Sequence, residues 1–218
     1  MIPRQIFCFW HDPDHLPPSV QGALNFSQLR TPDYSWCLAD DDLIQKLLAQ
    51  HYPTALQRLY QANQIPASRS DLARLILLYH YGGIYIDASM EIQEDPHNLL
   101  IGTAQHFVTV QRDDNPRYIK RPPLAHAVNS IFAAQRHHPA LEMALYIAWA
   151  NLVSRHYNHR VWYASGAYCL NQALGYHPAD ARRSFRTLKD RLFVYRRDPA
   201  VNNRWRQHQQ DGILPPVG

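Results

Sequence analysis

Three oxygen-bearing side chains stand two residues apart near the middle of the sequence, at Asp87, Ser89 and Glu91. In a continuous β-strand this spacing places all three on one face, because successive side chains alternate between faces. Carboxylates and hydroxyls are hard donors that suit Mg²⁺ or Mn²⁺, and these cations bind phosphate oxygens. The spacing predicts a divalent-metal and phosphate site; the alternative is a solvent-facing strand end that happens to be acidic.

Asp71 and Arg74 form a second candidate pair, because residues three apart are neighbours on a helix surface. A carboxylate accepts hydrogen bonds and a guanidinium donates them, so the pair can hold adjacent hydroxyls of a sugar. The alternative is an ordinary surface ion pair, worth roughly 0.2–1 kcal/mol.

Trp10 is the third candidate, at the end of the strand predicted over residues 5–10. Its indole could stack on a flat nucleobase, and the alternative is ordinary packing in the core or at its rim. The loop predicted over 11–18 is rich in proline, which forbids regular structure there.

These residues need elements that bring them together. The sequence predicts an amphipathic helix capped near residues 67–68, with its apolar side formed by Leu72, Leu75, Ile76 and Tyr79. It ends at residues 82–83, where two glycines predict a left-handed C-cap. A buried strand over 84–86 then leads into the acidic triplet. In open α/β sheets, ligands bind outside the carboxyl ends of strands, so this segment predicts a site.

The rest of the pattern predicts an α/β chain with a single domain over residues 1–198 and a tail over 199–218. Three aspartates at 40–42 supply an N-cap for the helix that follows them. We expect further strands over 34–38, 107–111, 128–134 and 193–195, helices over 43–50, 53–64 and 139–155, a charged loop over 112–123, and a loop entering a helix over 163–174.

The chain carries 22 Lys and Arg against 18 Asp and Glu, a formal net charge of +4, and the basic residues crowd its end. This region includes Arg182, Arg183, Arg186, Lys189, Arg191, Arg196, Arg197, Arg204 and Arg206. It could contact an anionic membrane surface or a phosphate-bearing ligand, and the alternative is a solvated helix face. The chain lacks the RNA motifs, zinc spacing and helix-turn-helix of nucleic-acid-binding proteins, so we expect no nucleic-acid partner.

Three widely spaced cysteines, Cys8, Cys37 and Cys169, favour reduced thiols over a disulfide framework or a zinc site. Adjacent histidines at 137–138 cannot easily converge on one ion, and we assign the histidines at 156 and 159 no metal either. No stretch approaches the roughly 18 apolar residues that span a bilayer, and no leader-like segment opens the chain. We therefore expect a cytoplasmic protein, with a contact at the inner face of the membrane left open.

Three segments together resemble glycosyltransferases with a DXD motif in their sugar-binding region, and in particular the branch of capsular polysaccharide synthesis proteins. Residues 2–10, IPRQIFCFW, are similar to the opening strand of that family, and residues 32–42, PDYSWCLADDD, to a later segment. Residues 67–89 match its most diagnostic motif, a helix of the form R-(S/A)-D-x-x-R that runs into YGGIYxD. The resemblance weakens beyond that segment and covers roughly the first 170 residues.

The resemblance implies a GT-A, Rossmann-like fold with a mixed central sheet flanked by helices, a UDP- or GDP-sugar donor, a glycan or lipid-linked acceptor, and Mn²⁺ or Mg²⁺. It implies catalytic roles for Asp71, Arg74 and Asp87, and donor contacts from Phe9, Trp10, Arg69, Asp71, Arg74, Tyr85, Asp87 and Ser89. It implies metal contacts from Asp87, Ser89, Glu91 and His208, and acceptor contacts from Asn129, Ser165 and Gly166.

One departure from the family pattern bears on activity. The second acid of the DXD triplet is Ser89 here, and a neutral hydroxyl holds a divalent cation less firmly than a carboxylate. Glu91 could supply the missing charge, the metal could be held weakly with help from His208, or catalysis could proceed without tight metal. The resemblance implies a retaining hexosyltransferase of polysaccharide biosynthesis; the alternative is a catalytically silent module that binds a sugar nucleotide or a glycan.

Overall fold

The protein is built on a mixed six-stranded sheet with the strand order β2-β1-β3-β6-β5-β7. A computed structural model describes residues 1–102, 105–112, 127–196 and 208–216. The strands are β1 (Gln5–Phe9), β2 (Ser35–Ala39), β3 (Gly83–Ile86), β5 (Phe107–Gln111), β6 (Ala127–Ala134) and β7 (Ala181–Ser184). Strands β2, β1 and β3 run parallel, β6 is antiparallel to both β3 and β5, and β7 is parallel to β5. The predicted mixed α/β sheet is confirmed.

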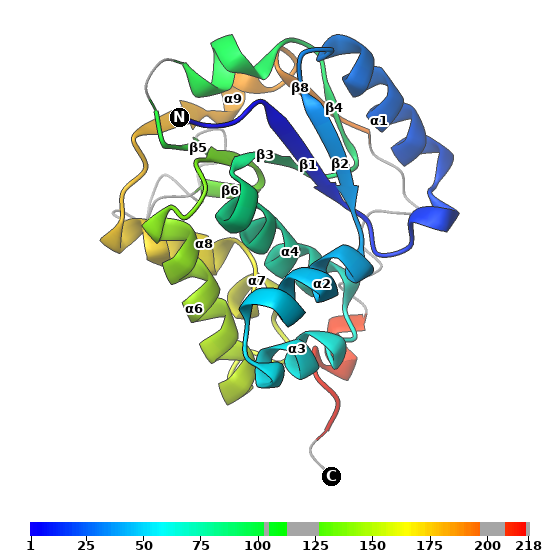
Figure 1. Cartoon of the computed structure of the whole chain (residues 1–218), viewed down its shortest axis with the longest axis vertical. Coiled ribbons are helices and arrows are strands. Elements are labelled where there is room, and N and C mark those ends of the chain that lie inside the picture. Colours follow the sequence, from blue (N-terminus) through cyan, green and yellow to red (C-terminus); the bar gives the residue numbers. More distant parts are fainter. Residues whose placement is uncertain (103–104, 113–126, 197–207, 217–218) are drawn as a thin grey trace.

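Helices cover both faces of this sheet (Figure 1). Helices α2, α3, α4, α6, α7 and α8 lie on one side, and α1, α9 and a two-stranded sheet of β4 and β8 lie on the other. The bounds are α1 (Pro18–Arg30), α2 (Asp41–His51), α3 (Thr54–Gln61), α4 (Pro66–Tyr81), α6 (Pro139–Ser154), α7 (Val161–Ala164), α8 (Ala167–Tyr176), α9 (Phe185–Leu188), β4 (Met90–Ile92) and β8 (Phe193–Tyr195). Short helical turns cover His97–Ile101, Pro13–His15 and Gln209–Asp211.

The alternation of side chains along the strands creates two hydrophobic cores. In β1, Phe7 and Phe9 pack with the larger helical layer, whereas Ile6 and Cys8 pack with the layer of α1. This follows from the two-residue period of a strand, which sends neighbouring side chains to opposite faces. Every residue of β3 is buried, as a strand covered on both faces requires.

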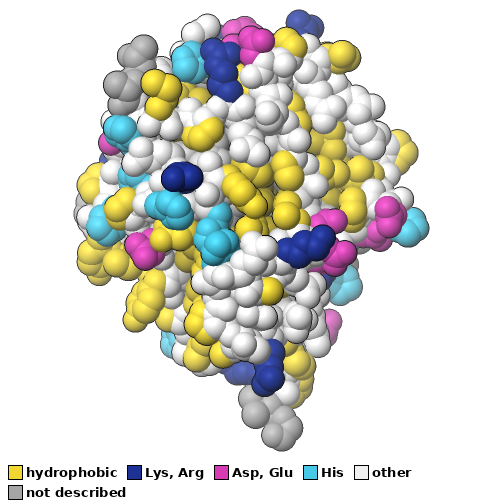
Figure 2. Space-filling view, in the orientation of Figure 1, with side chains coloured by type: hydrophobic (Ala, Val, Ile, Leu, Met, Phe, Trp, Pro, Cys, Tyr) yellow, Lys and Arg dark blue, Asp and Glu magenta, His cyan; other side chains and the backbone are white. Residues whose placement is uncertain are grey.

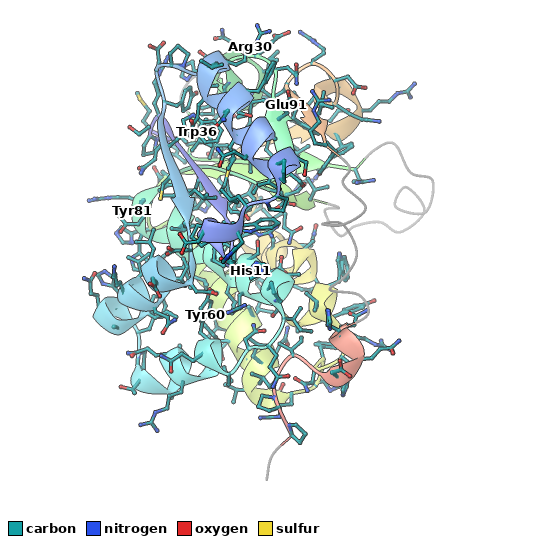
Figure 3. The ribbon with its side chains drawn as sticks, turned by 90° about the vertical axis from the view of Figure 1, so that its right-hand side faces the viewer. His11, Arg30, Trp36, Tyr60, Tyr81 and Glu91 are labelled. Carbon is teal, nitrogen blue, oxygen red and sulfur yellow. The ribbon has the colours of Figure 1, made fainter. Side chains whose placement is uncertain are left out.

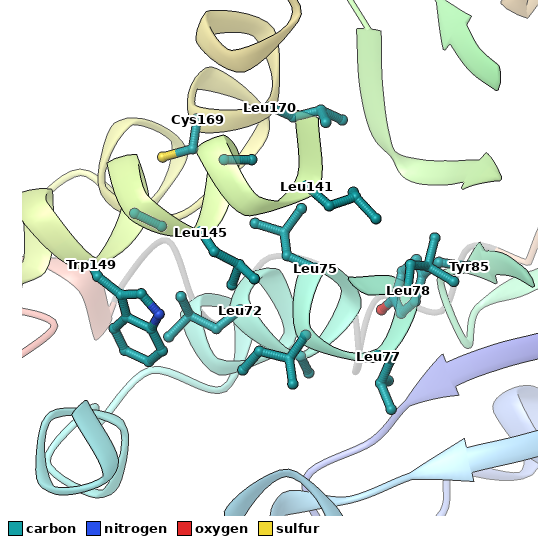
Figure 4. Close-up of a cluster of buried hydrophobic side chains, with 14 of the residues drawn as sticks. Leu72, Leu75, Leu77, Leu78, Tyr85, Leu141, Leu145, Trp149, Cys169 and Leu170 are labelled. Atoms are coloured by element: carbon teal, nitrogen blue, oxygen red, sulfur yellow. The ribbon is translucent and has the colours of Figure 1, made fainter. Parts of the chain in front are cut away.

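Helix α4 differs from its prediction in one respect, because it is buried around its whole circumference rather than along one stripe. Residues 71–78 are all buried. Leu72 and Leu75 lie toward Leu141 and Leu145 of α6, as Figure 4 shows, while other side chains of α4 face the sheet. A helix enclosed between a sheet and a second helix layer is apolar on several sides. Polar groups on this helix are therefore buried as well.

Local signals in the sequence are borne out at several element ends. The side chain of Asp40 accepts a hydrogen bond from the backbone N–H of Leu43, which caps α2. Gly82 has a φ of +69° and ends α4, as predicted. The strands predicted over 34–38, 107–111 and 128–134 match β2, β5 and β6 within one residue at each end. Elements α1, β4 and β7 have no counterpart with defined bounds among the predicted elements.

The alignment of Asp87, Ser89 and Glu91 on one face required a strand that continues past Ile86, and this condition is not met. Strand β3 ends at Ile86, and a turn follows in which the backbone N–H of Met90 donates to the carbonyl of Asp87. A turn breaks the alternation that would place residues 87, 89 and 91 on one face. The triplet is therefore divided between the turn and β4.

The predicted loop over 112–123 and the beginning of the predicted tail fall almost entirely outside the described residues. In the last described segment, Ile213 and Leu214 are buried in the core of the larger helical layer. The division into a domain and a tail remains a prediction. Within the described part of the chain, no helix combines the length and the apolar character that crossing a bilayer demands.

Candidate active site

A cavity of about 580 Å³ opens where β1 and β3 end, and the helical layer forms its other wall. Its walls come from the ends of β1 and β3, from the first turns of α4, and from α7 with the start of α8. The cavity brings together most of the residues predicted for the site: Phe9, Trp10, Asp71, Arg74, Tyr85, Asp87, Ser89, Asn129, Gly166 and His208. Three predicted residues, Arg69, Glu91 and Ser165, are not part of its lining.

The guanidinium of Arg74 lies between two carboxylates at the floor of the cavity. One terminal nitrogen is 3.3 Å from an oxygen of Asp71 and 3.4 Å from an oxygen of Asp87. Arg74 is only 5 % exposed and Asp71 only 6 %. Because surface pairs are much more exposed than this, the alternative of an ordinary surface ion pair does not hold.

Arg74 is also fixed by hydrogen bonds. It donates to the backbone carbonyls of Asn129 at 2.6 Å and Ser70 at 3.1 Å, and to the hydroxyl of Ser70 at 2.9 Å. Its guanidinium carbon lies 4.7 Å from the centre of the Tyr85 ring, in a cation–π contact. The Tyr85 hydroxyl in turn lies 3.1 Å from that of Ser70. The charge between the two acids is thus held in one position.

Asp71 begins a buried chain of polar side chains that runs into the helical layer. It accepts hydrogen bonds from the side-chain amide of Asn129 at 2.7 Å and from the hydroxyl of Ser165 at 3.2 Å. The Ser165 hydroxyl lies 2.9 Å from that of Ser68, which accepts from the Asn63 amide at 2.9 Å. A buried chain in which every member is paired holds its groups in a unique arrangement. Asp71 is therefore a preorganised acceptor.

Burial and charge act in opposite directions on the two acids. Burial raises the pKa of Asp71 to about 6; the positive charge of Arg74 lowers it, and the negative charge of Asp87 raises it. Burial also raises the pKa of Asp87, against the opposing effect of Arg74. Strongly shifted carboxyls in a cavity are typical of functional sites.

Glu91 lies elsewhere. It sits in β4, is buried, and forms an ion pair with Arg196, one nitrogen of which is 3.1 Å from Oε1 of Glu91. Figure 3 shows Glu91 well separated from His11, which lines the cavity. Its predicted contribution to a metal site is contradicted by this placement, because the strand that would have aligned it with Asp87 ends at Ile86.

Arg69 also faces another partner. Its guanidinium donates to a carboxylate oxygen of Asp41 at 2.6 Å, and the second oxygen of Asp41 accepts from the hydroxyl of Tyr60 at 2.7 Å. This group connects α4 to α2 and α3. The structure gives Arg69 a place beside the site rather than in its lining, so a direct donor contact is not part of the arrangement seen here.

The three residues predicted to contact an acceptor are close together. Asn129 and Gly166 line the cavity. Ser165 is 1 % exposed, lies outside the lining and donates a hydrogen bond to Asp71. Gly166 is required by packing: a Cβ there would lie 2.9 Å from the Cα of Trp162 and 3.1 Å from a carboxylate oxygen of Asp71. The absence of a side chain lets the loop before α8 approach Asp71 closely.

Few side chains of the cavity could ligate a divalent cation. They suit a cation whose remaining ligands are phosphate oxygens. The Asp87 side chain is 32 % exposed, and Ser89 and His208 line the same cavity. Within the described residues, no three His, Cys, Asp or Glu side chains converge as the ligands of a protein-only metal site would. Mg²⁺ is commonly held by one or two carboxylates together with substrate phosphates. One carboxylate with a hydroxyl and an imidazole fits that mode.

Histidines gather on another part of the surface, visible in Figure 2. The ring centres of His51 and His80 are 4.4 Å apart, and those of His80 and His137 are 6.2 Å apart. The pKa of His80 is lowered to about 4, first by burial and then by the charges of its two neighbours. None of the three lines the cavity.

Sequence reasoning missed three polar or aromatic residues of the cavity lining, Ser70, His11 and Trp162. Ser70 stands four residues before Arg74 on the same helix, and that spacing could have identified it as a partner. His11 follows Trp10 directly, with ring centres 5.6 Å apart. Trp162 lies in α7, far along the sequence, and only the fold places it at the cavity.

The fold is shared with a solved glycosyltransferase. The structure described as "PaToxG Glycosyltransferase" superposes with a TM-score of 0.56 and 17 % sequence identity, over 81 % of this chain and 70 % of that one. The fold is therefore that of a glycosyltransferase, and the predicted GT-A-like α/β class is confirmed. Residues 17–106 match the family described as "Glycosyltransferase sugar-binding region containing DXD motif".

Curated relatives come from two yeasts. Inositol phosphoceramide mannosyltransferase 2 of Schizosaccharomyces pombe is 26 % identical over 145 residues, which are 66 % of this chain and 38 % of that protein. Mannosyl phosphorylinositol ceramide synthase CSH1 of Saccharomyces cerevisiae is 39 % identical over 87 residues, which are 40 % of this chain and 23 % of that protein. The matched region spans less than half the length of either relative.

Proposed function

We propose that this protein is a glycosyltransferase that moves a hexose from a nucleoside diphosphate sugar to a hydroxyl of a glycan or lipid-linked acceptor. The observation that carries the proposal is the Arg74 guanidinium held between the carboxylates of Asp71 and Asp87 at the end of β3. The names of the curated relatives make mannose the first sugar to test and a lipid-linked acceptor the first acceptor class.

Asp71 would bind the donor sugar. Both of its oxygens already accept one hydrogen bond from the protein, and each keeps lone-pair capacity for a sugar hydroxyl. Arg74 keeps this carboxyl ionised and holds it in position, so a hydroxyl that donates to Asp71 meets a fixed acceptor. This is positioning and electrostatic preorganisation, which need no movement of the protein during the reaction.

The opposite end of the cavity would hold the nucleotide. Trp10 is partly buried and lines the cavity together with Phe9 and His11. An indole at that place offers a flat apolar face to a base. Asp87 would face the diphosphate between the base and the sugar, with Ser89 and His208 near it.

Asp87, Ser89 and His208 would hold Mn²⁺ or Mg²⁺ together with the diphosphate. The cation would neutralise the charge that develops on the departing nucleoside diphosphate. The proposal includes retention of the anomeric configuration, as in the transferases that the sequence resembles.

The deciding experiment measures release of nucleoside diphosphate from a panel of UDP- and GDP-sugars, GDP-mannose first, with and without Mn²⁺. Native protein is compared with Asp87→Ala and with the matched control Asp33→Ala, whose side chain is 76 % exposed. We expect release that depends on the metal, that Asp87→Ala abolishes and that Asp33→Ala preserves. Binding of a donor with no release would favour the silent binding module, and neither binding nor release would overturn the proposal.

We also propose that the basic region of β7 and α9 contacts an anionic membrane surface, where a lipid-linked acceptor would lie. Arg182, Arg186 and Lys189 are exposed there, and each basic residue near such a surface can add about 1 kcal/mol. Arg183 is excluded from the test because it donates to the carbonyl of Leu100 at 3.0 Å. Replacing Arg182, Arg186 and Lys189 by Gln should reduce binding to phosphatidylserine vesicles, and unchanged binding would refute the contact.

A further inference from the structure

Trp162 is an exposed indole at the rim of the cavity. It is 45 % exposed, although tryptophan is highly buried on average in folded proteins. It lies on α7 and lines the cavity beside Val161 and Gly166. Exposed apolar surface that forms part of a groove is typical of ligand-binding sites.

The indole is mounted on a rigid support. Its ring centre is 4.8 Å from that of Tyr163, edge to face at 82°, and 5.9 Å from that of Tyr168. Tyr163 stacks in turn on Tyr157 at 5.3 Å. The carbonyl of Tyr163 accepts a hydrogen bond from the side chain of Asn151 on α6 at 3.0 Å. A supported aromatic ring loses little conformational entropy when a ligand stacks on it.

The position of Trp162 is tied to that of Asp71. The backbone N–H of Ser165 and that of Gly166 both donate to the carbonyl of Val161 at 3.1 Å, which closes the loop after α7. Ser165 donates to Asp71 from that same loop. The atoms that hold Asp71 therefore also fix the helix that carries Trp162.

The two indoles of the cavity come from different walls. Trp10 follows β1, at the end that the proposed function assigns to the nucleobase, and Trp162 comes from the helical layer beside Asp71. A nucleotide-sugar donor has one nucleobase. When its sugar binds Asp71, that base can stack on only one of these two indoles. The second indole is left for the group that receives the sugar.

We propose that Trp162 forms the acceptor subsite, where the ring of a neutral hydroxylated acceptor, a pyranose or a cyclitol, stacks on the indole and directs a hydroxyl toward Asp71 and Asp87. The inference rests on the proposed function and names its acceptor class. A pyranose or cyclitol presents an apolar C–H face to an aromatic ring and keeps its hydroxyls at the edge, free for hydrogen bonds. Val161 and Ala167 supply further apolar surface beside the indole.

The test measures binding of two probes, methyl α-D-mannopyranoside and myo-inositol, by saturation-transfer NMR in the presence of nucleoside diphosphate and diamagnetic Mg²⁺. Native protein is compared with Trp162→Ala, with Trp162→Phe, and with the control Tyr176→Ala, an aromatic that is 71 % exposed outside the cavity lining. We expect native protein to bind at least one of the two rings. Trp162→Ala should weaken that binding at least roughly fivefold, since a stacking contact is worth about 1 kcal/mol. Trp162→Phe and the control Tyr176→Ala should retain it.

Kinetics separate this inference from the proposed function. In Trp162→Ala, hydrolysis of the donor by water should keep its KM for the donor, while transfer to the bound ring should show a raised KM for that ring. Equal ring binding in native protein and Trp162→Ala, or no ring binding by native protein, overturns the inference even if the donor is cleaved. Parallel loss of donor and ring binding in Trp162→Ala would place the indole in the donor site and likewise overturn it. Failure of donor cleavage in native protein refutes the proposed function, whereas the NMR measurement still decides the role of Trp162.

Discussion

At the scale of the residue, the site is organised around one buried cation that serves two acids. Arg74 satisfies carbonyls, a hydroxyl and two carboxylates at once, from a position where few of its atoms meet solvent. Removing one partner of such a buried group leaves the others without compensation, which costs more than the loss of a surface pair. The residue-scale predictions concern this charge and its partner Asp71.

Replacing Arg74 by Lys keeps the charge and loses the geometry. A lysine ammonium cannot reproduce the planar set of donors that reaches Ser70 and Asn129. We expect kcat/KM for the donor to fall by roughly 10²-fold or more and the free energy of unfolding to fall by about 1–3 kcal/mol, because a buried carbonyl loses its donor. Arg58→Lys, on the exposed side of α3, should change neither quantity. Native-like donor kinetics in Arg74→Lys would contradict the assigned role.

The pKa of Asp71 predicts how activity depends on pH. Only the ionised carboxyl accepts sugar hydroxyls on both oxygens, so kcat/KM for the donor should fall as the pH drops through about 6. An acid limb centred near the ordinary carboxyl value of 3.8 would show that burial does not shift this group.

The pH dependence of stability that comes from Asp71 should have the opposite sign to the pH dependence of activity. Between pH 3.8 and about 6 the folded state binds more protons at Asp71 than the unfolded state does. The contribution of Asp71 to stability is therefore largest at low pH and is lost as the pH rises through that window. The free energy of unfolding of native protein minus that of Asp71→Asn should decrease from pH 3.8 to 6, as measured by urea denaturation. A difference that rises or stays level would contradict the shift.

At the scale of the element, glycine decides how closely the central helix and strand can approach their neighbours. Gly83 has a φ of +107°, and a Cβ there would lie 2.5 Å from the carbonyl oxygen of Gln5 in β1. The start of β3 is thus pressed against β1 at a point where no side chain fits. The strand that carries Asp87 at its other end depends on this approach.

Gly83→Ala should destabilise the protein, by roughly 2 kcal/mol or more, because it combines a strained φ with a clash against backbone. Gly22→Ala is the matched control: this glycine lies on the exposed face of α1, and a Cβ there meets nothing within 4 Å. The control should gain about 0.5–1 kcal/mol, because alanine restricts the unfolded chain and favours helix. Urea denaturation of both variants tests the pair; equal midpoints would refute the argument.

Many of the helices and strands, and several of their ends, could be predicted from the sequence. Asp40 capped its helix, Gly82 ended α4, and the apolar runs became strands, because these signals act within a few residues. The turn after Ile86 could not be predicted, since nothing in the alternating Asp87, Ser89 and Glu91 pattern distinguishes a strand from a turn followed by a second strand. That one turn sends Glu91 to Arg196.

The residues of the site also fall into two groups, those that the local sequence pattern predicts and those that only the fold brings to the site. Asp71, Arg74 and Asp87 stand on one continuous stretch whose pattern is diagnostic, and the structure gathers them at one cavity. Asn129 and Trp162 reach that cavity, and Ser165 reaches Asp71, through pairing of β6 with β3 and through packing of α7, which are long-range features. The capsular, retaining and cytoplasmic expectations concern properties outside the fold and remain predictions.

At the scale of the whole molecule, the last described segment belongs to the body of the protein. Leu214 is 1 % exposed, and the backbone of Ile213 both donates to the carbonyl of Asn158 at 2.7 Å and accepts from the N–H of Gln64 at 2.8 Å. These bonds connect the segment to the loop after α6 and to the turn before α4. The segment therefore braces the helical layer that forms one wall of the cavity.

Leu214→Ala should cost about 2–5 kcal/mol of unfolding free energy, because it leaves a cavity in a packed core. Leu29→Ala removes the same atoms from a side chain that is 81 % exposed on α1, and it should lie within about 0.5 kcal/mol of native protein. Thermal denaturation of the two variants compares them directly. A small effect of Leu214→Ala would mean that this segment does not support the core.

The contacts that hold Asp71 and Arg74 have a consequence for the order of folding. Their bonds to Asn129 span 55 and 58 residues, and the bond from Ser165 to Asp71 spans 94. Loops of this length close late and slowly compared with the formation of α4 itself. During refolding, helical content should therefore return well before affinity for the donor, so that ligand binding becomes the signal that the chain has reached its native topology.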